Sequence, residues 1–181
     1  CRKIGSVYER RSDYNLALEW FQHGLRLLPP RSTSERSRGC VAIAGVLFRT
    51  GLYDEAGSWC LRGLRYARLA GDVPELAHAH NLLGSIRLEK GQIRRAVGHQ
   101  LCALGMYEQL GHLTGQADTL VNLGLDYVSL GEWPQAVERF QECLRIASRI
   151  GDLDLMAIVH NNLGEVFLAQ GEVARAKAEF R

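Results

Sequence analysis

The sequence predicts an all-α chain built from antiparallel helix pairs, and three observations support this prediction. Glycine recurs every 20 residues through most of the chain, and self-similarity at a period of about 20–50 residues marks a repeat architecture. The segments between these glycines are rich in Leu, Ala, Arg, Glu and Gln, which favour helices. The sequence contains no Asn-Gly or Asp-Gly pair, so the strongest short signal of a β-hairpin is missing. The periodic glycines are Gly51, Gly71, Gly91, Gly111, Gly131, Gly151 and Gly171.

Each periodic glycine is expected to end a helix, because glycine adopts the left-handed conformation after a helix at little cost. Within 133–150, Val137, Phe140 and Leu144 recur at the spacing of one helical face. The predicted helices, in order, cover 1–11, 13–28, 33–50, 53–70, 73–90, 93–110, 113–130, 133–150 and 153–170, and a last one begins at 173.

Three residues that share one phase of the repeat are predicted to cap helix N-termini. They are Ser32, Asp72 and Asp152, whose side-chain oxygens can accept from the first free backbone N–H groups. Glu35 and Glu75 follow three residues later, which is the spacing of a capping box. The helix starts are therefore marked as clearly as the helix ends.

The composition is that of a folded protein without an obvious charged or lipid partner. Of 181 residues, 46% are apolar and 23% charged, and the formal net charge is +2. This charge gives no sign of nucleic-acid binding, and no apolar run approaches the roughly 18 residues of a membrane span. Five cysteines without a CxxC pair indicate isolated buried thiols in a reducing, cytoplasmic setting. Arginine outnumbers lysine 19 to 3, which favours a bacterial source.

The repeat becomes more specific when its recurring small and aromatic residues are aligned. The first helix of each pair carries a small residue at Gly5, Ala44, Gly84, Gly124 and Gly164. The second helix carries an alanine at Ala17, Ala56, Ala96, Ala136 and Ala176. Aromatic residues follow these positions at Tyr8, Tyr127, Phe167, Phe21, Phe140 and Phe180. This pattern resembles the tetratricopeptide repeat family over essentially the whole chain.

Two departures from the family pattern narrow the resemblance. The unit is 40 residues long, whereas the family unit has about 34, and Leu47, Arg87, Cys60 and Gln100 replace expected aromatics. The long unit resembles a subgroup found in kinesin light chains, in Pins-like adaptors of cell polarity, and in bacterial regulators. Those regulators include transcription activators and ATPase–cyclase signalling proteins.

The resemblance implies a right-handed superhelical solenoid of about four and a half repeats. The chain lacks an initiator Met and both of its ends fall inside predicted helices. It is therefore predicted to be a single array, 1–181, that forms part of a longer protein. The expected repeats are 1–31, 32–71, 72–111, 112–151 and 152–181.

In this family the first helices line a concave groove that binds protein or peptide. Two residues before the small glycine lie Asn122 and Asn162, and an Asn at this position in related proteins grips the backbone of an extended peptide. An amide suits that role because it offers both a donor and an acceptor. The further groove candidates are Asn81, Asn161, Ser85, Glu165, His78, Asp118 and Arg38. The alternative is that these residues are solvated or satisfy nearby backbone groups.

No enzyme motif is found: phosphate-loop, dinucleotide-binding, serine-hydrolase, zinc-protease and zinc-deaminase patterns are all missing from the sequence. The six histidines have no metal-site spacing. No catalytic residue, cofactor or metal is therefore expected, nor a nucleic-acid or membrane partner. The stripe of Arg62, Arg65 and Arg68 is interpreted as a solvated face, and Trp20 and Trp59 as packing residues.

The sequence as a whole predicts a binding scaffold, the sensor or partner-binding region of a bacterial regulatory protein. Two alternatives stay open at this point. The array could be a structural spacer or a self-association module, or it could be the regulatory segment of a larger signalling enzyme, an ATPase or a cyclase. The identity of the ligand and the oligomeric state cannot be predicted from these residues.

Overall fold

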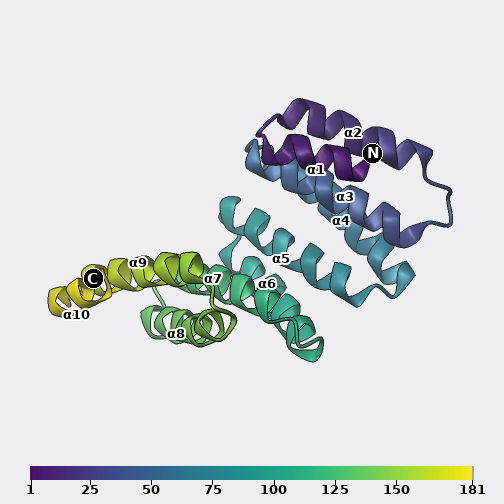
Figure 1. Ribbon diagram of the computed structural model, residues 1–181. Helices are drawn as coiled ribbons and strands as arrows, with labels where there is room; N and C mark the ends of the chain where they lie inside the picture. The colour runs from purple at the N-terminus through teal and green to yellow at the C-terminus, as the bar shows by residue number, and fades with distance from the viewer. Residues whose placement is uncertain (181) are drawn as a thin grey trace. The chain divides into compact units, whose positions relative to one another are not determined.

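The computed structural model describes residues 1–180 and, over those residues, contains ten α-helices and no strands (Figure 1). This confirms the all-α class. The helices are α1 (Arg2–Arg10), α2 (Tyr14–Leu27), α3 (Thr33–Arg49), α4 (Tyr53–Ala70), α5 (Val73–Glu89), α6 (Ile93–Gln109), α7 (Leu113–Leu130), α8 (Trp133–Ile150), α9 (Leu153–Ala169) and α10 (Val173–Glu179). Every predicted helix boundary that can be compared lies within one residue of the observed one.

The turn between α4 and α5 shows how two residues are enough to reverse the chain. Gly71 has φ of 63°, the left-handed conformation that an L side chain adopts only with strain. Asp72 then donates its N–H to the carbonyl of Ala67 at 3.1 Å, which closes the end of α4. The same Asp72 caps α5, because its Oδ1 accepts from the N–H of Glu75 at 3.2 Å. The glycine period therefore fixes the helix length.

Asp72, Asp152 and Ser32 all occupy the predicted N-cap positions, but only the two aspartates cap through the side chain. Asp152 Oδ1 accepts from the N–H of Leu155 at 3.0 Å. The Ser32 side chain makes no capping hydrogen bond. A backbone turn holds this position instead, since the N–H of Ser32 donates to the carbonyl of Pro29 at 3.1 Å.

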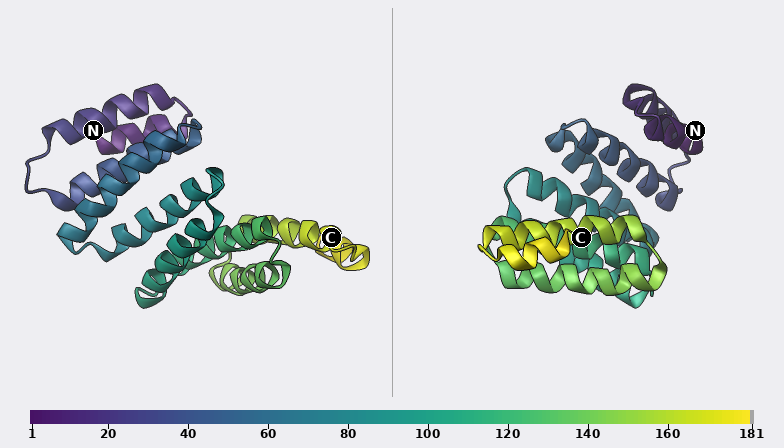
Figure 2. Two further views of the ribbon diagram at one scale, coloured as in Figure 1. Left: turned by 180° about the vertical axis from the view of Figure 1, so that it is seen from behind. Right: turned by 60° about the vertical axis from the view of Figure 1, so that its left-hand side comes forward.

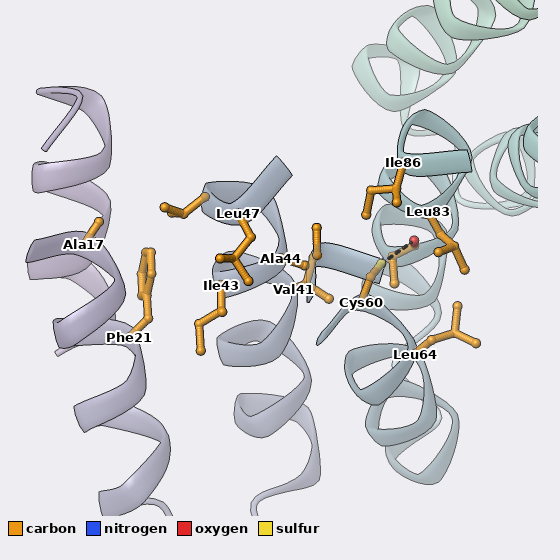
Figure 3. Packing of buried hydrophobic residues seen from close by; sticks show 13 residues of the cluster. Ala17, Phe21, Val41, Ile43, Ala44, Leu47, Cys60, Leu64, Leu83 and Ile86 are labelled. Carbon is orange, nitrogen blue, oxygen red and sulfur yellow. Dashed lines mark hydrogen bonds between the residues drawn. The ribbon is translucent and has the colours of Figure 1, made fainter. Parts of the chain in front are cut away.

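Internal contacts divide the chain into two compact units, Cys1–Gln92 and the part from Ile93 onward, here called unit 1 and unit 2. In unit 1 the first and second helices of each pair pack in antiparallel fashion, as two further views show (Figure 2). The core of unit 1 includes Phe21, Ile43 and Leu83, all at most 2% exposed (Figure 3). Cys60 lies among them and its thiol donates to the carbonyl of Ala79 at 3.2 Å.

In unit 2, a recurring small residue of the repeat packs against a recurring aromatic ring. The ring of Phe140, in α8, lies against Gly124, in α7, so closely that a Cβ at Gly124 would lie 2.6 Å from two ring carbons. Phe140 is fully buried, and burial of such a side chain contributes about 1.5–3 kcal/mol. The small residue of the first helix and the aromatic residue of the second helix therefore contact each other directly.

Three of the five cysteines, Cys40, Cys60 and Cys143, are buried, and all five are free thiols. Trp20 and Trp59 are half-buried, and Trp59 packs against the core of unit 1. The predicted packing role of Trp59 is thus correct, although this side chain also lines a hollow that is described below.

Candidate functional site

Unit 1 contains a polar hollow of about 280 Å³ among the first helices of its pairs, α1, α3 and α5. Arg38 and His78, two of the predicted groove residues, both line it. Ala42 and Leu82 line it as well, and these are the positions equivalent by repeat to Asn122 and Asn162. The predicted phase therefore faces this hollow in unit 1.

The hollow is lined by one face of each helix. On α3 the hollow is lined by Val41 and by Arg38, Ala42, Gly45 and Arg49. The last four are spaced by four, three and four and so lie along one stripe. Ile43 and Ala44 are fully buried in the core, whereas Val41 lines the hollow and is also a core residue. We call the positions of these four residues, and their equivalents in the other repeats, the groove stripe.

Charged groups of both signs line this hollow, and they pair across neighbouring helices. Arg38 Nη2 lies 3.1 Å from Asp72 Oδ2, and its Nε lies 3.8 Å from Glu75. A hydrogen bond from Ser34, with further donors from the Glu75 backbone and from Arg38, lowers the pKa of Asp72 although burial opposes this. The acidic and basic groups therefore hold one another in place at neutral pH.

Two other residues extend the charged lining toward the ends of the helices. Arg49, at the end of α3, forms an ion pair with Glu9 of α1. His78 Nδ1 lies 3.9 Å from Glu75 Oε1. Glu9 and Glu75 also line the hollow but were not among the residues predicted from the sequence. Both lie three residues from another lining residue on the same helix, which is the signal that identifies them.

The other two predicted residues of α5, Asn81 and Ser85, are not among the residues that line this hollow. Asn81 and Ser85 are half-buried, and the Ser85 hydroxyl donates to the carbonyl of Asn81 at 3.4 Å. This is the local bond to the helix backbone that serine commonly makes.

In unit 2 the groove stripe of α7 carries Asp118, Asn122 and Leu125. Asn122 and Leu125 are half-buried, and Asp118 is exposed as a residue. Partial burial of its carboxyl and the negative charge of Asp152 nevertheless raise the pKa of Asp118, while His112 opposes this.

On α9 the equivalent stripe carries Ile158, Asn162 and Glu165. Ile158 is 52% exposed and adds apolar surface to the stripe. Asn162 is half-buried and Glu165 is exposed. The stripe thus presents an amide, a carboxylate and an apolar surface side by side.

Asn161 precedes Asn162 on α9 and so points about 100° away from it around the helix axis. Asn161 lines a separate hollow of about 470 Å³ between α9 and α10, together with His160 and Glu179. Its amide donates to Glu165 Oε1 at 3.1 Å. His160 Nδ1 lies 2.7 Å from Glu179 Oε2.

Within the described residues, no group of three or more His, Cys, Asp or Glu side chains has the arrangement of a metal site. A search of the same residues finds no helix that is both long and apolar enough to span a membrane.

The sequence matches a family model for the tetratricopeptide repeat over residues 37–109 and 115–181. The chain belongs to the tetratricopeptide repeat family. No curated protein matches the chain by sequence.

Solved structures share the fold at low sequence identity. BtubC from P. vanneervenii is 21% identical with a TM-score of 0.84, and the match covers 97% of this chain and 73% of that one. A Rap protein complexed with competence and sporulation factor is 15% identical with a TM-score of 0.86, covering 98% of this chain and 50% of that one. A signal transduction ATPase with a tetratricopeptide repeat sensor, PH0952 from Pyrococcus horikoshii, is 14% identical with a TM-score of 0.88, covering 98% and 27%.

Proposed function

We propose that this chain is a non-catalytic binding module that holds a protein or peptide partner along its groove stripes. The observation that carries the proposal is the polar hollow of unit 1, lined by the repeat positions that become Asn122 and Asn162 in unit 2. Repeat folds of this class commonly place binding on such surfaces and not in a catalytic pocket.

The chemistry of the stripes suits an extended peptide. Asn122 and Asn162 lie one repeat apart, and each amide can both donate to and accept from a peptide unit whatever its side chain. The exposed Ile158 offers an apolar contact next to Asn162. The ion pair of Arg38 with Asp72 provides charges that select among partners.

We further propose that the array senses a partner on behalf of a larger bacterial regulatory protein in the cytoplasm. Two similar structures support this role. The Rap protein was solved with competence and sporulation factor bound, and in PH0952 the tetratricopeptide repeats are described as a sensor. The present chain matches only half of the former and 27% of the latter, so the output domain of such a protein would lie outside this match.

The test is a selection of phage-displayed random peptides on the purified chain, followed by fluorescence-polarisation titration of the selected peptides. Asn122→Ala/Asn162→Ala is expected to weaken binding about tenfold or more, since each lost amide removes hydrogen bonds of about 1 kcal/mol. The matched control is Asn15→Ala/Gln141→Ala, which removes two exposed amides from second helices. Failure to select any peptide, or equal weakening by both double variants, would contradict the proposal and favour a structural spacer.

A further inference from the structure

A second hollow of unit 1 lies among α2, α3 and α4, on the side of the second helices. Its volume is about 480 Å³, within the range of small-molecule sites of about 300–1,000 Å³. Three arginines and two aromatic residues dominate its lining: Arg26, Arg36, Arg62, Trp59 and Tyr66. We call it the arginine–aromatic pocket. The buried Cys40 lies at its base.

The positive charge of this pocket is not compensated. Among the described residues that line it, none is acidic. Over residues 1–180, moreover, none of Arg26, Arg36 and Arg62 forms an ion pair with a carboxylate. This distinguishes the pocket from the polar hollow of the groove stripe, where Arg38 and Arg49 both face carboxylates.

Two of the three guanidinium groups are held in place by uncharged partners. Arg36 donates from Nη2 to the carbonyl of Leu28 at 2.7 Å and from Nε to that of Pro29 at 3.1 Å. Arg62 stacks on Trp59, with its Cζ 4.3 Å from the ring centre. Neither contact neutralises the charge, and both leave donors of the guanidinium free. The guanidinium groups of Arg36 and Arg62 are therefore held in positions from which they can donate hydrogen bonds to an anion.

The environment of Cys40 indicates that both guanidinium groups lie near the base of the pocket. Burial raises the pKa of the Cys40 thiol, and the positive charges of Arg62 and Arg36 oppose this shift. A smaller hollow of about 210 Å³ continues along α4, with Arg65 in its lining and with Arg62 and Tyr66 shared between the two. The basic lining thus extends beyond the pocket itself.

We propose that the arginine–aromatic pocket binds a phosphate ester joined to a planar ring. A phosphate carries a charge of about −1.5 to −2 and three strong acceptor oxygens, which suits several converging guanidinium groups better than a singly charged carboxylate. Tyr66, Trp59 and the apolar Leu25 supply the surface on which a ring packs. A free nucleotide and a phosphotyrosine side chain both present this chemistry. The site is separate from the groove stripes and does not depend on their function.

The test follows the emission of Trp59 while phenyl phosphate is titrated at constant ionic strength. The chain has three tryptophans, so the Trp20→Phe/Trp133→Phe background isolates the one in the pocket. We expect saturable binding, with a dissociation constant about tenfold or more higher in Arg26→Ala/Arg62→Ala. Arg145→Ala/Arg149→Ala removes the same charge from exposed positions of α8 and is expected to change nothing. Circular dichroism checks the folding of each variant.

Three results would overturn the proposal. The first is the lack of a saturable change with phenyl phosphate. The second is equal weakening in the two double-arginine variants, which would indicate non-specific attraction. The third is equal affinity for phenyl phosphate, inorganic phosphate and benzoate, since neither the ring nor the dianion would then matter. Arg62→Lys keeps the charge and loses the planar donor pair, so it is expected to weaken binding as well. Titration with adenosine monophosphate and with a phosphotyrosine peptide then distinguishes the two sources.

Discussion

Asp126 of α7 is a buried carboxylic acid whose replacement is expected to raise stability. The residue is fully buried, and within the described part of the chain neither of its carboxyl oxygens has a hydrogen-bond partner. The positions equivalent by repeat are Val46, Ile86 and Val166, which are all apolar and at most 2% exposed. Asp126 therefore carries a potential charge at a position that elsewhere in the chain packs hydrocarbon.

The cost can be worked out from the pKa. Burial raises the pKa of Asp126 from 3.8 to about 7. At about 1.36 kcal/mol per pKa unit, the ionised form costs up to about 4 kcal/mol of folding free energy. The folded state holds the proton more tightly than the unfolded state, so stability is greatest at low pH and falls as pH rises toward the folded pKa. Between about pH 5 and about pH 8, ionisation of Asp126 is expected to lower the free energy of unfolding by about 2–3 kcal/mol.

The assay is urea unfolding followed by circular dichroism at both pH values, for the wild type, Asp126→Asn and Asp126→Val. The Asn side chain has nearly the same volume as Asp and does not titrate. From the lower to the higher pH, the free energy of unfolding of Asp126→Asn is therefore expected to fall by about 2–3 kcal/mol less than that of the wild type. All other ionisable groups are common to the three proteins and cancel in the comparison. The Val variant is expected to be the most stable at about pH 8. Equal pH dependence in the wild type and the Asn variant would refute the reasoning.

Two further predictions concern packing, and thermal or urea unfolding measures both. Gly124→Ala is expected to destabilise the fold by about 1–3 kcal/mol, because the added Cβ would press on the buried ring of Phe140. Its control is Gly98→Ala, where a Cβ meets nothing within 4 Å. This control is expected to stabilise the fold by up to about 1 kcal/mol. Equal effects would show that the ring contact does not decide the cost. Ser37→Ala removes the buried hydrogen bond that the Ser37 hydroxyl donates to the carbonyl of Gly63 at 2.7 Å. It is expected to lower the free energy of unfolding by about 1–3 kcal/mol, and an unchanged stability would contradict this prediction.

The fold was predictable because local chemistry determines where each helix ends. Gly71, Gly131 and Gly151 all adopt the left-handed conformation directly after a helix, so counting glycines amounts to counting turns. Ser32 does occupy the N-cap position of α3, but its side chain makes no capping bond, and the connection through Pro29 closes by a backbone hydrogen bond instead. Residue type alone does not distinguish a side-chain cap from a backbone turn of this kind.

The groove was predicted better than its chemistry. The stripe position of Arg38 and His78 follows from helical periodicity, and both residues do line the hollow of unit 1. The partners of Arg38, however, are Asp72 and Glu75, which lie 34 and 37 residues further along the chain in a neighbouring pair of helices. Contacts over such separations depend on how helices pack, which a single sequence does not state.

The arginine–aromatic pocket illustrates the same limit more strongly. The predicted solvated stripe of Arg62, Arg65 and Arg68 is indeed exposed, but Arg62 also lines this pocket. The structure brings Arg26 and Arg36 to it from two other helices and stacks it on Trp59. The sequence alone therefore does not distinguish a basic stripe on one helix from a basic pocket, because the pocket depends on how three helices pack.

The groove stripe and the fully buried core residues occupy largely different positions of the same helix, and this separation bears on how such chains evolve. On α3, Ala42 and Gly45 face the hollow while Ile43 and Ala44 are sealed in the core. Under the proposed function, a mutation at a stripe position that does not contact the core changes what is recognised and has little effect on the packing between helices. Successive repeats can thus acquire new specificities one residue at a time, and a duplicated repeat brings with it a scaffold already able to fold.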